Sequence, residues 1–265
     1  MMSELSVLEA EASEGFEIPT PSQWLSELQS VLFDVFKRQL RKQIDSLNSF
    51  PELKTTLTSS ELHHHYVSKR FAQLLLSCLQ ALASFQRPLD LALVELKKLE
   101  QAYFAWAGKV ATYVRDRKES TIFLLNNIDL VSRTCNSLAG ADLNASLKFK
   151  FDSQMTRLVQ LELETSFADL LSILSGSNPA AINQINADLS RNLKLRIDRV
   201  KSQSFLYFSN VEVGHQFRKQ FCQAAFDLYS KYVDYFDRNF GKNALEQEND
   251  ALPPDLNQIK FIFEE

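Results

Sequence analysis

Glycine and proline are both scarce in this chain of 265 residues, which contains 6 glycines and 7 prolines. The prolines lie where helices would begin or between them, at Pro19, Pro21, Pro51, Pro88, Pro179, Pro253 and Pro254. Because both residue types interrupt helices, their scarcity leaves long segments that can be helical. No alternation of apolar and polar residues is long enough to predict a strand. The sequence therefore favours an all-α fold.

The chain also lacks a strong charge and a long apolar run. Its net charge of -4 argues against general affinity for nucleic acid or anionic lipid, although a local basic patch is compatible with this total. The richest apolar run, residues 71–85, is interrupted by polar residues and does not predict a membrane span. Residues 1–16 contain 4 glutamates and no basic residue, which does not fit a signal or transit peptide. The cytosol is the expected location.

Cysteine is the third scarce residue type. Cys78, Cys135 and Cys222 are odd in number, far apart and surrounded by apolar residues. This pattern is typical of buried, reduced thiols in a cytosolic protein rather than of a disulfide framework.

Apolar residues recur at three- and four-residue steps through most of the chain, which predicts amphipathic helices. We expect helices from Pro21 to about Phe50, from Ser59 or Ser60 to Phe85, over 88–135 as one long helix, over about 143–174, from Pro179 to a bend or stop at 211–214, from there to Gly241, and over about 254–262. Residues 1–18 are expected to be a flexible acidic tail. Residues 19–139 and 140–265 are expected to form two continuous helical bundles.

The stretch from Arg117 to Val131 stands at the centre of this plan. Its apolar residues Ile122, Leu125 and Ile128 would share a buried helix face. Asn126, Asn127 and Asp129 follow among them, and such side chains are costly to bury without partners. They are expected at a seam between helices or on the surface.

Nothing in the sequence predicts catalysis. It contains no glycine-rich phosphate loop, no nucleophile elbow and no paired cysteine motif. The best metal ligands are His63, His64 and His65, but three successive helix residues point in different directions and cannot chelate one ion. The carboxylate pairs Glu162/Glu164 and Asp234/Asp237 are typical of solvated helix faces. We expect no catalytic, cofactor-binding or metal-binding residues.

Aromatic residues are dense from residue 205 to residue 240. They fit either a core of interlocked rings or, in part, a surface for a partner protein. Four basic residues at positions 37, 38, 41 and 42 favour a solvated helix face over contact with acidic lipid.

Several motifs together resemble one protein family. They are His65-Tyr66-Val67-Ser68-Lys69-Arg70-Phe71-Ala72, the charges at 117–119 followed by Ile122-Phe123-Leu124-Leu125-Asn126-Asn127-Ile128-Asp129, Ser204-Phe205-Leu206-Tyr207-Phe208-Ser209-Asn210, and the closing segments around Leu228-Tyr229, Tyr235-Phe236 and Leu252-Pro253. Their order and approximate spacing are similar to the carboxy-terminal part of the Vps52-type subunit of the GARP and EARP vesicle-tethering complexes.

This resemblance implies a fold and a function. The fold would be an elongated stack of antiparallel helical bundles, as in multisubunit tethering complexes. The chain would be a non-catalytic subunit of a vesicle-tethering complex. It would act by scaffolding and protein–protein contacts in endosome-to-trans-Golgi retrograde transport and endosomal recycling. The implied partners are the sibling tether subunits, a Golgi Rab GTPase and endosomal SNAREs, with a peripheral location on the trans-Golgi network and endosomes. The alternative is a stand-alone helical regulatory module that binds one partner helix or a small GTPase.

The motif residues expected to have structural or interaction roles are Tyr66, Arg70, Phe123, Leu125, Asn126, Asn127, Asp129, Phe205, Phe208 and Asn210.

Overall fold

The computed structural model describes residues 20–49, 62–83, 90–135, 141–176, 182–240 and 252–264. Every regular element in these ranges is a helix, and none is a strand, so the all-α prediction is confirmed. Within these ranges, no helix is long and apolar enough to cross a membrane. The acidic tail, the cap at Ser59 or Ser60 and the stop at Gly241 lie outside the described residues.

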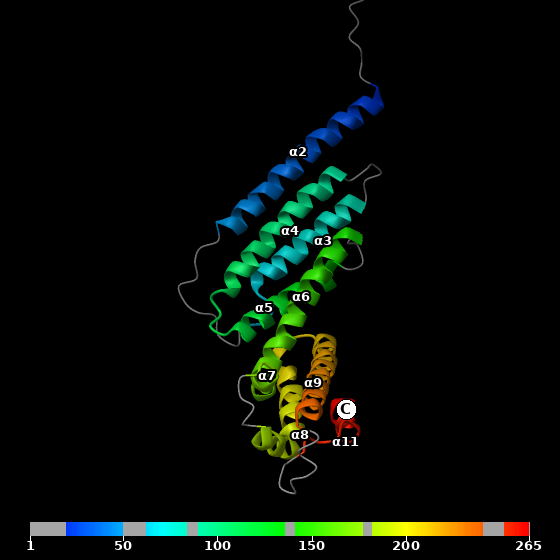
Figure 1. The fold of residues 1–265 in the computed structure, drawn as a ribbon. Helices are drawn as coiled ribbons and strands as arrows, with labels where there is room; N and C mark the ends of the chain where they lie inside the picture. Colours follow the sequence, from blue (N-terminus) through cyan, green and yellow to red (C-terminus); the bar gives the residue numbers. More distant parts are fainter. Residues whose placement is uncertain are drawn as a thin grey trace, which may run out of the picture. The chain divides into compact units, whose positions relative to one another are not determined.

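Figure 1 shows the helices that the described ranges contain. Their bounds are α2 Pro21–Asn48, α3 Tyr66–Ala83, α4 Asp90–Ala111, α5 Arg117–Cys135, α6 Ala141–Ser166, α7 Ala168–Leu174, α8 Ile182–Tyr207, α9 Val211–Asn239 and α11 Leu256–Glu264. The predicted break between the fifth and sixth helices lies just before 211–214, at Phe208–Asn210.

The prediction of one long helix over 88–135 is wrong, because a turn separates α4 from α5. The amides of residues 112–114 donate to carbonyls three residues earlier, which tightens and ends α4. The Asp116 carboxylate then accepts hydrogen bonds from the amides of Lys118 and Glu119, at 2.6 and 3.1 Å. These bonds satisfy donors that the first turn of a helix leaves unpaired. An aspartate cap thus starts α5 where neither proline nor glycine is present.

The prediction of one helix over 143–174 is also wrong. The backbone of Phe167, at φ -132° and ψ 33°, separates α6 from α7. The carbonyl of Ser166 accepts a hydrogen bond of 3.0 Å from the Arg196 guanidinium on α8. A distant side chain therefore binds the carbonyl at the end of α6.

The described helices belong to two compact units. One comprises residues 1–49 and 88–102. Its helix α2 begins with a capping box, in which the Thr20 hydroxyl accepts from the Gln23 amide at 3.3 Å and the Gln23 side chain accepts from the Thr20 amide at 2.6 Å. Leu40 is buried. Six large hydrophobic residues between positions 24 and 35 of α2 are exposed, namely Trp24, Leu25, Leu28, Val31, Leu32 and Val35.

The other unit comprises residues 50–87 and 103–265. In it α5 packs against both α3 and α6, and α9 packs against α6, α7, α8 and α11 (Figure 1). The Tyr103 ring stacks on Phe71 with 4.0 Å between centroids, and its hydroxyl donates to the Ser68 hydroxyl at 2.9 Å. The boundary predicted between residues 139 and 140 stays a prediction.

Most aromatic residues between 205 and 240 form core. Six of those described are buried, namely Phe208, Phe217, Phe221, Tyr229, Tyr232 and Phe236. Among the described aromatic side chains of this segment, only Phe205 is exposed, at 65%. The interlocked core therefore accounts for most of the aromatic density.

Candidate functional site

Asn126 lies near the middle of α5 and joins two loop segments that are far apart in sequence. Its amide nitrogen donates to the carbonyl of Leu62 at 3.1 Å and to the carbonyl of Tyr207 at 2.8 Å. Its amide oxygen accepts from the backbone N–H of Ser209 at 3.2 Å. The side chain is 2% exposed. One buried amide therefore satisfies backbone groups both before α3 and after α8.

Asn127 does the same for the segment before α3. Its amide nitrogen donates to the carbonyl of His63 at 3.2 Å and to that of Phe123 at 2.7 Å. Its oxygen accepts from the backbone N–H of His65 at 2.9 Å. The residue has no exposed surface. Its amide group is therefore enclosed by groups of this chain.

Asp129 completes the set on the next turn of α5. Its carboxylate accepts from the Asn210 amide nitrogen at 3.2 Å and pairs with Arg133 one turn later at 2.8 Å. The oxygen of Asn210 accepts from the Glu212 amide at 3.1 Å and so caps the start of α9. The carboxylate thus orients the residue that begins the next helix.

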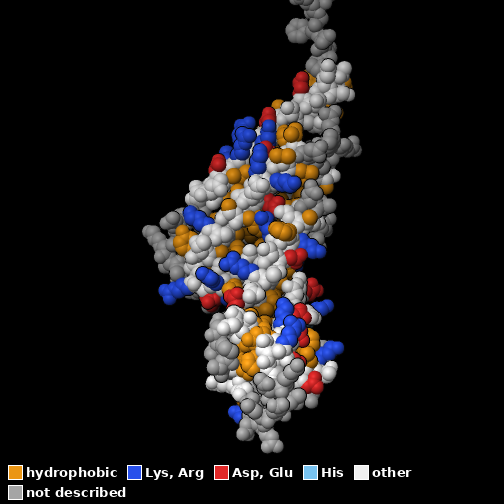
Figure 2. Space-filling model, viewed as in Figure 1, with side chains coloured by type: hydrophobic (Ala, Val, Ile, Leu, Met, Phe, Trp, Pro, Cys, Tyr) orange, Lys and Arg blue, Asp and Glu red, His pale blue; other side chains and the backbone are white. Residues whose placement is uncertain are grey.

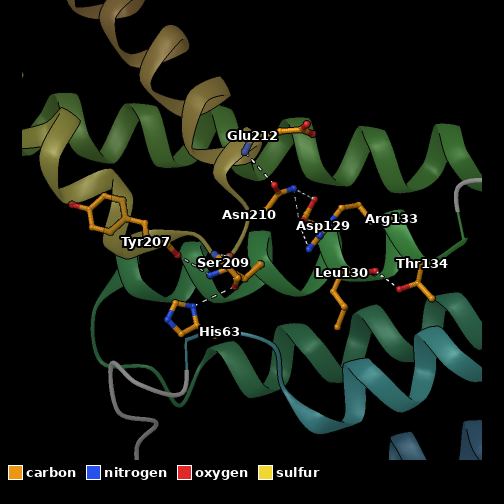
Figure 3. Close-up of polar contacts among 10 residues, drawn as sticks. His63, Asp129, Leu130, Arg133, Thr134, Tyr207, Ser209, Asn210 and Glu212 are labelled. Carbon is orange, nitrogen blue, oxygen red and sulfur yellow. Dashed lines mark hydrogen bonds and ion pairs between the residues drawn. The ribbon is translucent and has the colours of Figure 1, made fainter.

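We call these residues the polar node, defined as Leu62, His63, His65, Asn126, Asn127, Asp129, Tyr207, Ser209 and Asn210. Figure 3 shows its outer part, with Asn210 between Asp129 and Glu212 and with His63 opposite Ser209. Residues 62–65 are not helical, so the prediction that put Leu62 inside the second helix is wrong. The asparagines of α5 instead form hydrogen bonds with backbone groups of residues 62–65, which would pair with other backbone groups if this segment were helical.

A charged cluster lies beside the node. Lys118 pairs with Glu162 of α6 at 3.0 Å, and its ammonium lies 4.9 Å from the centroid of the Tyr207 ring. Burial alone would lower the pKa of Lys118, but the hydrogen bonds to Tyr207 and Glu162 and the charge of Glu162 outweigh it and raise this pKa. The Glu162 side chain is only 3% exposed, so the prediction of a solvated helix face is wrong for this residue, and Lys118 supplies the partner that a buried carboxylate needs.

A second cluster joins α7 to α8. The Arg196 guanidinium binds both carboxylate oxygens of Asp169, at 2.9 and 2.7 Å, and also pairs with Asp188. The hydrogen bond from Asn192, followed by that from Arg196, lowers the pKa of Asp188. These contacts hold a seven-residue helix, α7, in place.

The three neighbouring histidines face different surroundings. The Nδ1 atom of His63 lies 3.4 Å from the Ser209 hydroxyl. The pKa of His64 is lowered, chiefly by burial. The His65 ring packs against Trp106, with 5.1 Å between centroids. In the part of the chain that the structure describes, no group of three or more His, Cys, Asp or Glu side chains is placed to hold a metal ion.

The motif residues named from the sequence separate by burial. The buried ones are Phe123, Leu125, Asn126, Asn127, Asp129 and Phe208. Asn210 is partly buried, whereas Tyr66, Arg70 and Phe205 are exposed. The structure brings the asparagines, Asp129 and Asn210 together in the node.

No sequence pattern directly indicates the hydrogen-bond partners of these residues. The backbone groups of Leu62, His63, His65, Tyr207 and Ser209 carry no side-chain signature. The motifs 65–72 and 204–210 contain His65, Tyr207 and Ser209 and were the available signal for these three residues, because both motifs flank a helix end; Leu62 and His63 lie outside them. The ion pair between Lys118 and Glu162 had no local signal, since its residues lie on different helices.

These observations define a class of protein, an all-α helical-bundle protein whose buried polar clusters bind its own loops and helix ends. Residues 8–161 match the family described as "Vps52, C-terminal". The chain therefore belongs to the Vps52 family, in the region of its C-terminal domain. Asn126, Asn127 and Asp129 lie within the matched residues.

A comparison with curated proteins gives a distant relative. The chain is similar to vacuolar protein sorting-associated protein 52 A of Arabidopsis thaliana, with 22% identity over 259 residues. The match covers 92% of this chain and 36% of the relative, so the chain spans about a third of that protein's length. No solved structure matches.

Proposed function

We propose that this chain acts as a non-catalytic subunit of a vesicle-tethering complex of the GARP or EARP type. Its task would be endosome-to-trans-Golgi retrograde transport and endosomal recycling, through scaffolding and protein–protein contacts. The observation that carries this proposal is the family match over residues 8–161, which includes α2 to α5 and the asparagines of the node. The name of the Arabidopsis relative associates that protein with vacuolar protein sorting, a transport process.

The node has a structural role in this proposal. Asn126 and Asn127 each make three hydrogen bonds to backbone groups, and neither offers surface to a partner. They would fix the segments before α3 and after α8 against α5. The node would thus make one rigid body from helices that are distant in sequence, which a scaffold requires.

The exposed face of α2 is the best surface for a sibling subunit. Trp24, Leu28, Val31 and Val35 are each at least 41% exposed, and their spacing of four, three and four residues is that of a coiled-coil seam. Figure 2 shows hydrophobic and basic side chains next to each other along α2. An amphipathic partner helix with acidic flanking residues would fit such a face.

Further partners belong to the same proposal. A Golgi Rab GTPase and endosomal SNAREs are the expected ones, with a peripheral location on the trans-Golgi network and endosomes through these partners. The exposed motif residues Tyr66, Arg70 and Phe205 would be available for such contacts.

Recovery of partners from cells tests the proposal. Tagged chain is expressed and purified under mild conditions, and the bound proteins are identified by mass spectrometry. We expect sibling tether subunits in the eluate. A variant with Leu28→Glu and Val31→Glu should lose them without losing stability, because both positions are exposed.

The control for this test is a double change at exposed positions of another helix of the chain. Lys148→Glu and Arg157→Glu on α6 alter two exposed residues and should leave recovery unchanged. An eluate without any sibling subunit would overturn the tether proposal. Recovery of one small GTPase or one helical protein alone would favour the stand-alone regulatory module.

A further inference from the structure

A groove between α8, α9 and α11 concentrates positive charge in a chain whose net charge is -4. Its volume is about 470 Å³, within the range of small-molecule sites. The lining residues are Lys201, His215, Arg218, Lys219, Cys222, Gln223, Phe226, Lys260 and Phe263. They include 4 lysines or arginines and no carboxylate. We call this feature the basic groove.

Specific contacts hold the walls of the basic groove in place. The Lys201 ammonium donates to the carbonyl of Ile262 near the end of α11, at 3.1 Å. The rings of Phe226 and Phe263 meet edge to face with 5.5 Å between centroids. The Tyr229 hydroxyl donates to the carbonyl of Pro254 at 2.7 Å. Helix α11 is therefore tied to both α8 and α9, and the groove is preformed.

Contacts with neighbouring side chains also hold Arg218 of α9 in place. Its guanidinium donates to the Ser204 hydroxyl at 3.0 Å and lies 4.3 Å from the centroid of the Phe205 ring. It also lies 2.8 Å from Nδ1 of His215, and since arginine has only donors, this histidine nitrogen accepts. The cation thus keeps a defined position in the groove. Lys219 and Lys260 are exposed on α9 and α11.

The chemistry of the groove fits a ligand with several negative charges. Cations gathered around one concavity repel each other, and a multivalent anion removes this repulsion. Phosphate groups are natural ligands for such lysines and arginines. The rings of Phe226 and Phe263 add apolar surface that can contact the carbon skeleton of a cyclic headgroup.

Exposed apolar residues beside the groove favour a lipid over a soluble phosphate compound. Phe261 follows Lys260 and is 53% exposed. Phe205, which packs on Arg218, is 65% exposed. Aromatic side chains beside basic ones are typical of proteins that rest on a membrane surface.

We propose that the basic groove binds the phosphorylated headgroup of an acidic phospholipid, with Phe261 entering the interfacial layer of the membrane. The chain would then touch the membrane itself, in addition to any contact made through partner proteins. The proposal does not depend on assembly with sibling subunits.

Vesicle flotation with the purified full chain tests the proposal. The vesicles contain phosphatidylcholine alone, phosphatidylcholine with phosphatidylserine, or phosphatidylcholine with a phosphorylated phosphatidylinositol, the last two matched in total negative charge. We expect the phosphoinositide vesicles to bind the most protein. The variant Lys219→Ala/Lys260→Ala should weaken binding by roughly fivefold for each lysine removed. Phe261→Ser should weaken binding to the same vesicles without changing the affinity for a soluble inositol phosphate.

The matched control is Lys194→Ala/Lys231→Ala. It removes two exposed lysines from α8 and α9 outside the groove and should leave flotation within twofold of the parent. Circular dichroism spectra of both double variants should equal that of the parent.

Equal losses in the two double variants would overturn the proposal, as would equal binding to all three kinds of vesicle. Calorimetric binding of inositol hexakisphosphate without any flotation would assign the groove to a free phosphate compound and also overturn it. Because no other protein is present, these outcomes are independent of whether the chain recovers sibling subunits from cells.

Discussion

Replacement of Asn127 by alanine is the sharpest test of the polar node. The change removes the acceptor of the His65 N–H, at 2.9 Å, and the donors to the carbonyls of His63 and Phe123, at 3.2 and 2.7 Å. The Phe123 carbonyl keeps its helical partner, whereas the His65 N–H loses the acceptor that it has in the parent. Asn127→Ala therefore isolates the cost of releasing one loop segment from α5.

The magnitude follows from these contacts. An unsatisfied buried donor costs about 1–3 kcal/mol, and the remaining hydrogen bonds contribute about 1 kcal/mol net. The higher helix propensity of alanine offsets up to about 0.7 kcal/mol of this loss. We expect a loss of about 1–4 kcal/mol in the free energy of unfolding. Asn127→Asp should cost more, because it loses both donors and buries a charge.

Urea unfolding followed by circular dichroism and tryptophan fluorescence measures this loss. Trp106 is 2% exposed and lies 5.1 Å from the His65 ring, so its emission reports on the same segment. A Trp24→Phe background removes the other tryptophan, which is 60% exposed. The control Asn239→Ala changes an exposed asparagine and should stay within about 0.5 kcal/mol of the parent.

If Asn127→Ala unfolds at the same urea concentration as its parent, the node does not hold the segment before α3. Unchanged stability together with lost recovery of partner proteins would instead place Asn127 at an interface.

Three further predictions use other groups. Asn210→Asp keeps a capping residue for α9 but places a second carboxylate next to Asp129, so its melting temperature should fall. The melting temperature of Asn210→Ser should fall less. The pKa of Asp188 is lowered, chiefly by the hydrogen bond from Asn192, so its contribution to stability is present above its ordinary pKa of 3.8 and is lost as the pH falls below that value. Acid titration of stability should therefore be shallower in Asp188→Asn, and an unchanged slope would contradict this. Burial raises the pKa of the Cys135 thiol to about 11, so in a Cys78→Ala/Cys222→Ala background Ellman's reagent should modify it only upon unfolding, and fast reaction of this native variant would refute its burial.

The helical plan of the chain could be read from sequence because its signals are local. The capping residues at Thr20 and Pro21 lie next to the apolar pattern they start, and α2 begins there. The break between α4 and α5 could not be found in this way, since it contains neither proline nor glycine. Asp116 is one of many acidic residues, and only its contacts with the next amides identify it as a cap.

The node shows why the roles of Asn126 and Asn127 lay beyond sequence patterns. Asparagine forms helix less well than alanine, so two in succession within α5 cost up to about 0.7 kcal/mol each in local terms. The compensating stabilisation comes from hydrogen bonds with backbone groups 62 to 83 residues away along the chain, and no periodic pattern in the sequence indicates such bonds. Residues that lower the stability of their own helix are informative, because a stable helix retains them only when contacts with distant groups offset this loss. Polar residues that interrupt the buried face of a helix are therefore the positions at which loop-to-helix hydrogen bonds should be sought first.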